Sequence, residues 1–193
     1  LTSTGSGVGW EDAGSGATFK TFGTSSIMIG DNATGTIDAA NYNTGLGVDI
    51  FAALTTGDNN IAVGFASLTA LTTGSQNTAV GESSMAAITS GQGNTAVGSK
   101  SLDAGTTAND NTAIGYKALT TNTEGHYNVA VGKDALEMAT TADSNTAVGF
   151  KALEANTTGA ANTAVGANAL DANTTGGSNI AIGKDAVTAN TSG

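Results

Sequence analysis

Hydrophobic and polar positions follow a pattern that repeats every 17 residues along most of the chain. A phrase of the form Asn-Thr-Ala-Val-Gly recurs in ten copies without insertion or deletion. Its last residue is always a glycine: Gly30, Gly47, Gly64, Gly81, Gly98, Gly115, Gly132, Gly149, Gly166 and Gly183. One added residue would shift a whole coil out of its hydrogen-bonded ladder, so a strict period indicates stacked units of equal length.

The residues before each glycine predict a strand with two unlike faces. With the glycine as position zero, position −1 is aliphatic in all ten copies and position −2 is alanine in eight. Position −3 is always Thr, Ile or Val, and position −4 is asparagine in nine copies. Because side chains alternate along a strand, positions −3 and −1 share one face, and positions −4, −2 and zero share the other.

A second apolar column lies four residues after the glycine. Its members are Phe51, Leu68, Met85, Leu102, Leu119, Leu136, Leu153, Leu170 and Val187. We expect this column to meet the aliphatic −1 column across a narrow interior, with the alanines pointing outward. Thr at position +8 and Gly or Ala at position +10 are typical of a turn. Each repeat therefore predicts strand, turn, short strand and turn.

These elements predict an all-β fold, a parallel β-solenoid of ten 17-residue coils. A coil of 17 residues is too short to include a helix and still return to stack about 4.8 Å above its start. The solenoid domain is expected to span residues 26–193 and to form a rod about 45 to 50 Å long. Residues 1–25 lack the period, and they are predicted to cap the solenoid or to connect it to a preceding domain.

Alanines that point outward would form a flat apolar stripe along the rod. Such stripes are typical of interfaces, and small side chains in register allow close approach of a second copy. The sequence therefore predicts a homo-oligomer. The expected interface residues are Ala62, Ala79, Ala96, Ala113, Ala130, Ala147, Ala164 and Ala181.

The repeated phrase resembles that of a known family of fibrous proteins. Residues 77–81, 111–115 and 162–166 are similar to the Ser-Val-Ala-Ile-Gly repeats in the heads of YadA-like trimeric adhesins. Residues 111–119 are closer still to the Asn-Thr-Ala-Val-Gly-Tyr-x-Ala-Leu repeats of phage tail fibres and bacterial surface fibres. The resemblance implies a left-handed β-roll assembled as a homotrimer around a shared threefold axis. The family's head repeat is usually shorter, so the additional residues are expected in the outer turns.

Composition and charge exclude several classes of partner and of chemistry. The net charge of −10, with only six Lys and Arg residues, disfavours binding to nucleic acid or to an anionic membrane. No apolar run reaches the ~20 residues that span a bilayer, so no membrane insertion is expected for this segment. The chain has no cysteine and one histidine, and its carboxylates recur in fixed columns as an acidic stripe. We therefore expect no cofactor, no metal site, no catalytic residues and no enzymatic activity.

Four side chains in or near the predicted outer turns are candidates for contact with a receptor. Tyr116 and Phe150 directly follow their glycines, and His126 and Tyr127 lie together in one turn. Exposed aromatic rings are good anchors for sugars and proteins, although packing between coils is their commoner use. Asn32, Asn156, Asn173 and Asn190 lie in glycosylation sequons. Three of them lie in the repeated turn, which would produce the motif without selection for sugar attachment.

The sequence as a whole favours a structural and adhesive segment of a homotrimeric extracellular fibre. Such a fibre belongs either to a virion tail or to a bacterial cell surface and serves host or surface attachment through a glycan or protein receptor. The extension Tyr116-Lys117-Ala118-Leu119 favours the phage form. Two alternatives stay open: an ice-binding β-solenoid that uses a threonine column, and a polysaccharide-degrading solenoid.

Overall fold

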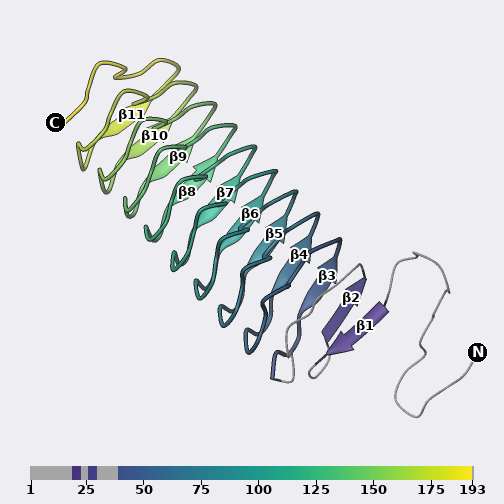
Figure 1. Cartoon of the computed structure of the whole chain (residues 1–193). Coiled ribbons are helices and arrows are strands. Elements are labelled where there is room, and N and C mark those ends of the chain that lie inside the picture. The colour runs from purple at the N-terminus through teal and green to yellow at the C-terminus, as the bar shows by residue number, and fades with distance from the viewer. Residues whose placement is uncertain (1–18, 23–25, 30–38, 193) are drawn as a thin grey trace, which may run out of the picture.

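The chain folds into one long stack of short strands (Figure 1). The computed structural model describes residues 19–22, 26–29 and 39–192. Its eleven strands pair in chain order in a single sheet, with β1 and β11 at opposite ends. The strands are β1 (Phe19–Phe22), β2 (Ser26–Ile29), β3 (Thr44–Leu46), β4 (Ile61–Val63), β5 (Thr78–Val80), β6 (Thr95–Val97), β7 (Thr112–Ile114), β8 (Val129–Val131), β9 (Thr146–Val148), β10 (Thr163–Val165) and β11 (Ile180–Ile182).

Strand pairing confirms a parallel β-solenoid. From β2 onward every pair is parallel, and each residue lies opposite its counterpart 17 positions further along, as Ala113 lies opposite Ala130. The described residues contain no helix, so each connection is made of turns and bends. Of the predicted leader, the structure describes only β1, which pairs antiparallel with β2. The remaining residues of 1–25 lie outside the described part of the chain.

The expected second strand of each repeat is wrong: among the described residues, each repeat from β3 onward contains one strand, and that strand has three residues. The stretch after the glycine is instead a series of turns, in which positions +2 and +4 have left-handed backbones. Lys117 has φ 56° and Leu119 has φ 53°, for example. Such a backbone costs a non-glycine residue roughly 1 to 2 kcal/mol. Hydrogen bonds to the next coil offset this cost, and the Leu119 N–H donates to the Ala135 carbonyl at 3.0 Å.

The prediction of which strand face points inward is also wrong. The alanines at position −2, and the asparagines at position −4 from Asn43 to Asn162, point into the coil and are buried. Positions −3 and −1 are half-buried or exposed on the outside. The predicted burial of the +4 column is confirmed from Phe51 to Leu170. Its leucines pack over alanine rather than over valine. One layer of leucine fills so thin a coil, so the opposite face must carry a small side chain.

The expected interface alanines therefore have no outer surface to offer a partner. All eight, from Ala62 to Ala181, are buried within the single chain and belong to its hydrophobic core. Alternation along a strand defines two faces, but it does not say which one is inside. The outer face of the sheet consists instead of Thr, Val, Ile and Leu.

A ladder of asparagines holds the inner side of each coil to the next. The Asn111 Oδ1 atom accepts hydrogen bonds from the backbone N–H and the side-chain amide of Asn128, at 2.9 and 3.1 Å. Its Nδ2 atom donates to the Gly125 carbonyl at 2.8 Å and to the Asn94 Oδ1 atom at 3.2 Å. Only an amide both donates and accepts in this way, which explains asparagine at position −4.

The glycine column is required by close stacking. Gly98 has φ 136°, and a Cβ atom added there would lie 2.5 Å from the Gly115 carbonyl oxygen. No side chain fits at that distance, and the backbone conformation is one that side chains disfavour. The glycines therefore set how closely successive coils approach, and they mark the point where each strand ends.

Candidate functional sites on one face and two edges

The outer face of the sheet is an uncharged strip that runs the length of the stack. Position −3 contributes Thr in most strands and position −1 contributes Val, Ile or Leu, and neither column contains a charged residue from β3 to β11. Val97 is 37% exposed and Ile114 is 39% exposed in the single chain. With nine strands about 4.8 Å apart, this outer strip is about 40 Å long.

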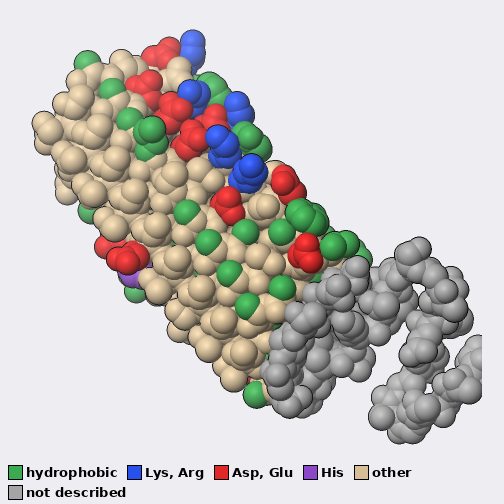
Figure 2. All heavy atoms as spheres, viewed as in Figure 1, with side chains coloured by type: hydrophobic (Ala, Val, Ile, Leu, Met, Phe, Trp, Pro, Cys, Tyr) green, Lys and Arg blue, Asp and Glu red, His purple; other side chains and the backbone are tan. Residues whose placement is uncertain are grey.

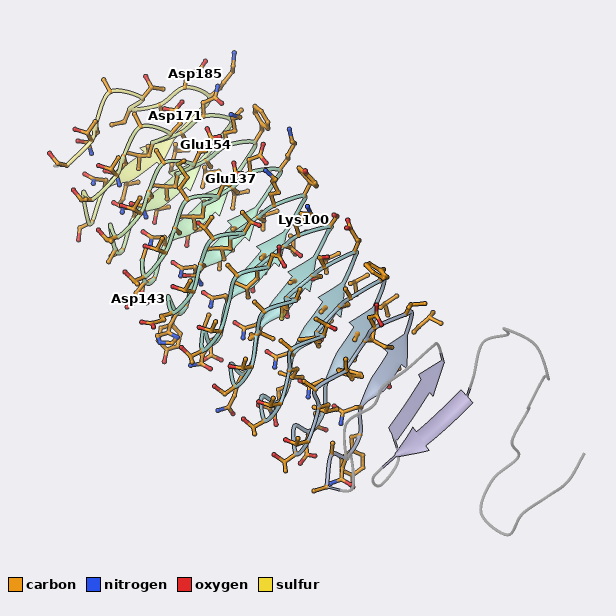
Figure 3. All side chains as sticks on the ribbon, viewed as in Figure 1. Lys100, Glu137, Asp143, Glu154, Asp171 and Asp185 are labelled. Carbon is orange, nitrogen blue, oxygen red and sulfur yellow. The ribbon has the colours of Figure 1, made fainter. Side chains whose placement is uncertain are left out.

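One edge of the stack, just after the strands, collects nearly all of the cations. Five of the chain's six lysines lie at positions +1 and +2: Lys100, Lys117, Lys133, Lys151 and Lys184. Figure 2 shows these cations interleaved with carboxylates and hydrophobic side chains along one side of the molecule. Figure 3 places Lys100, Glu137, Glu154, Asp171 and Asp185 along this edge, which we call the lysine edge.

Charge pairing neutralises most of the lysine edge. Lys117 bonds Glu137 at 3.1 Å, and Lys151 bonds Glu154 at 2.7 Å. The hydrogen bond from each lysine to its glutamate, with the glutamate's charge, raises the pKa of both lysines. Lys133 approaches Asp134 at 3.3 Å. Because these pairs are exposed to solvent, each contributes little to stability.

Two of the predicted receptor contacts lie on the lysine edge, two coils apart. Tyr116 is 45% exposed and Phe150 is 43% exposed. The Lys133 Nζ atom lies between them, 5.9 Å from the centre of the Tyr116 ring and 5.6 Å from that of Phe150. Lys117 and Lys151 approach the same two rings at 5.7 Å. The rings are therefore already occupied by cation–π contacts within the chain.

The other two predicted contacts lie on the opposite edge, before the strands. There His126 and Tyr127 line a hollow of about 340 Å³ together with Gln76, Gln92, Gly93, Asn109 and Asp110. Figure 2 shows the single histidine on the side away from the lysines, and Figure 3 places Asp143 on that same side. We call this cavity the Gly93 hollow. The sequence thus predicted four contact residues, which the structure divides between two edges.

Hydrogen bonds from backbone N–H groups to side-chain acceptors of the next coil link the successive coils that line the Gly93 hollow. The backbone N–H of Gln92 donates to Asn109 Oδ1 at 2.8 Å, and that of Asn109 donates to His126 Nδ1 at 3.0 Å. The His126 N–H in turn donates to Asp143 Oδ1 at 2.6 Å. Since Nδ1 of His126 accepts a hydrogen bond, the neutral ring carries its proton on Nε2.

Sequence reasoning missed Gln76, Gln92, Gly93, Asn109 and Asp110. The available signal was at position −5, where Gly93 is the one glycine in a column of larger side chains from Tyr42 to Ser178. Gly93 has φ 68°, close to the φ of 61° at Gln76 and 55° at Asp110. The hollow is therefore lined, at this one coil, by a residue without a side chain.

The structure also shows how far the sequon asparagines and the threonines at position +8 are buried or hydrogen-bonded. Asn156 and Asn173 are fully buried, so neither side chain is accessible to a sugar transferase in the folded chain; Asn32 lies outside the described residues. Along position +8 the hydroxyls donate to carbonyls of the next coil, as Thr72 does to Thr89 at 3.0 Å. This threonine column, which motivated the ice-binding alternative, therefore uses its hydroxyls within the stack.

Within the described ranges no three His, Asp or Glu side chains are grouped so as to hold a metal ion. None of the segments described forms an apolar helix of membrane-spanning length. Comparison with protein-family models, with curated proteins and with solved structures finds no match to this chain. The candidate sites are thus defined by geometry: the outer strip, the lysine edge and the Gly93 hollow.

Proposed function

We propose that the chain is the structural and adhesive segment of a homotrimeric extracellular fibre, a phage tail fibre or a bacterial surface adhesin that serves host or surface attachment. In this proposal ten left-handed coils from each of three chains pack around one axis. The observation that carries the proposal is the uncharged outer strip on a chain whose net charge is −10. The resemblance of the repeated phrase to trimeric fibre repeats supports the number three.

A second copy of the same chain is the partner that fits this strip best. Each side chain of the outer strip recurs once per coil, with a rise of about 4.8 Å. Only a partner with the same rise can keep its side chains in register with Val97, Ile114 and their counterparts along the whole stack. Copies of one chain meet this condition automatically, and closed symmetry leaves no strip exposed.

The test is to place charges on the outer strip and measure the mass of the assembly. We expect the double variant Val97→Glu and Ile114→Glu to dissociate, because two carboxylates per chain would be buried without partners. The matched control is Thr141→Glu, at an exposed bend whose column already holds Glu124 one coil earlier. A double variant that keeps the mass of the unaltered assembly would refute the proposed interface.

One observation favours an ice-binding β-solenoid as a second candidate. The threonines at position −3 lie on the outer strip at a regular spacing, so their hydroxyls could order water on a flat face. Ile61, Val129 and Ile180 interrupt this column. Both candidates require the same strip, so a monomer with thermal hysteresis would favour ice binding, and an oligomer without hysteresis would favour the fibre. Nothing in the described residues specifically favours the polysaccharide-degrading alternative.

A further inference from the structure

We propose that the Gly93 hollow binds a neutral saccharide unit. The inference deepens the proposed function, since it names the chemical class of receptor that the fibre would contact. It assigns contact to the edge that holds His126 and Tyr127 and not to the edge that holds Tyr116 and Phe150. The shape, the polar groups and the charge of the hollow carry it.

The shape of the hollow suits a small ligand. Its volume of about 340 Å³ falls at the lower end of the range of about 300 to 1,000 Å³ found for ligand pockets. The hollow spans several successive coils because its lining extends from Gln76 to Tyr127. Gly93 lines the hollow without a side chain of its own, and the Asp110 carboxylate lies where a Cβ atom at that residue would be.

Polar side chains around the hollow have hydrogen-bonding capacity to spare. Within the described ranges, the side chains of Gln76, Gln92 and Asp110 make no hydrogen bond to another protein group, unlike the buried asparagines of the ladder. Each glutamine amide can donate and accept, and the carboxylate can accept. His126 adds an Nε2–H donor because its Nδ1 atom is occupied. Adjacent hydroxyls of a sugar also donate and accept, so they match this set of groups.

An aromatic ring stands beside these polar groups. Tyr127 is 63% exposed, and its ring centre lies 6.1 Å from that of His126. No lysine lines the hollow, in contrast to the rings of the lysine edge. An exposed tyrosine offers an apolar face and a polar tip, a combination that fits the C–H face and hydroxyl rim of a sugar ring.

Charge selects an uncharged ligand. The lining contains one carboxylate and no lysine, and five of the six lysines lie on the opposite edge. An anionic sugar would therefore bring its carboxylate next to Asp110 without a cation to balance it, in a chain of net charge −10. A neutral hexose or N-acetylhexosamine has no such penalty.

The decisive variant adds a side chain at Gly93, and its Cβ atom displaces the Asp110 carboxylate from the position it holds beside that glycine. Gly93→Asn adds a side chain at a φ that asparagine tolerates well and that Gln76 and Asp110 already adopt in the same column. Ser144→Asn is the matched control: it makes the same residue in the same column, at φ 60°, outside the hollow. Asp110→Ala is the second variant, which removes one acceptor and leaves the hollow open.

The experiment titrates the full chain with galactose, glucose, mannose and N-acetylglucosamine, and with N-acetylneuraminic acid as the anionic comparison, by saturation-transfer NMR. We expect at least one neutral sugar to bind, Gly93→Asn and Asp110→Ala each to weaken it at least tenfold, and Ser144→Asn to leave it unchanged. The inference is overturned if no neutral sugar binds, if the anionic sugar binds more tightly, or if both variants bind like the control.

The same samples separate this inference from the proposed fibre. Light scattering reports the mass of each variant, and the Gly93 hollow lies at the edge, outside the two columns of the outer strip. A trimer that binds none of the neutral sugars would overturn the saccharide inference alone. A monomer that binds a neutral sugar through Asp110 would overturn the homotrimer alone.

Discussion

Replacing Asn111 by alanine tests whether the asparagine ladder stabilises the stack as strongly as its geometry implies. The Asn111 side chain is 1% exposed, and its Oδ1 atom accepts two hydrogen bonds from Asn128. The variant removes that acceptor from both donors at once. A water molecule can replace the lost Oδ1 acceptor only if it fits into the small cavity that the substitution leaves.

The expected cost follows from counting the groups that are left without a partner. Carbonyls that lose the Asn111 amide keep another donor, as Gly125 keeps Asn122 at 2.9 Å and Asn109 keeps Tyr127 at 3.2 Å. The Asn128 backbone N–H and one N–H of its side-chain amide keep none. A buried group without a partner costs about 1 to 3 kcal/mol, so Asn111→Ala should lower the free energy of unfolding by about 2 to 6 kcal/mol.

The matched control is the last asparagine of the same ladder. Asn179 is half-buried, and its Nδ2 atom donates to Asn162 at 3.0 Å, but no described donor uses its Oδ1 atom. Asn179→Ala should therefore cost about 1 kcal/mol, the net value of one hydrogen bond. Guanidinium unfolding followed by circular dichroism, at one protein concentration, measures both variants. Equal costs for the two variants would refute the ladder as a main source of stability.

Two further predictions concern single positions. Gly98→Ala should destabilise the chain by more than about 2 kcal/mol, because it combines a left-handed backbone with a collision against the next coil. Gly105→Ala should be neutral or stabilising, because its Cβ atom would meet only ordinary contacts from 3.4 Å. Thermal unfolding of the two variants checks the contrast, and a similar loss of stability in both would contradict it. Desolvation raises the pKa of Asp103, so its ionised form opposes folding, and Asp103→Asn should raise the Tm at pH 7. This gain in Tm should disappear well below pH 3.8, where the carboxyl is protonated in both the folded and the unfolded state. A gain that persists at acidic pH would show another cause.

Much of the fold could be predicted because the repeat leaves few choices. Ten phrases without an insertion fix the register, so Ala113 had to lie opposite Ala130 in a parallel pair. The burial of the leucines at position +4 followed from their regularity. The left-handed turns at Lys117 and Leu119 could not be predicted, since neither residue favours positive φ and only contacts between coils impose it.

The size of the side chains, and not their hydrophobicity, decided which face of each strand points into the coil. Valine is more hydrophobic than alanine, so sequence reasoning placed Val97 inside and Ala96 outside. In the structure Ala96 is buried beneath the leucine column and Val97 is exposed. The Gly93 hollow escaped prediction for another reason: its lining residues come from several successive coils, so they are not adjacent in the sequence.

The mass of the native assembly tests the central claim most directly. The claim is that the outer strip of Thr, Val, Ile and Leu is covered by further copies of the chain. Light scattering on the purified protein should give three times the chain mass of 18.6 kDa. A particle with the mass of one chain, stable and soluble at high concentration, would contradict the account.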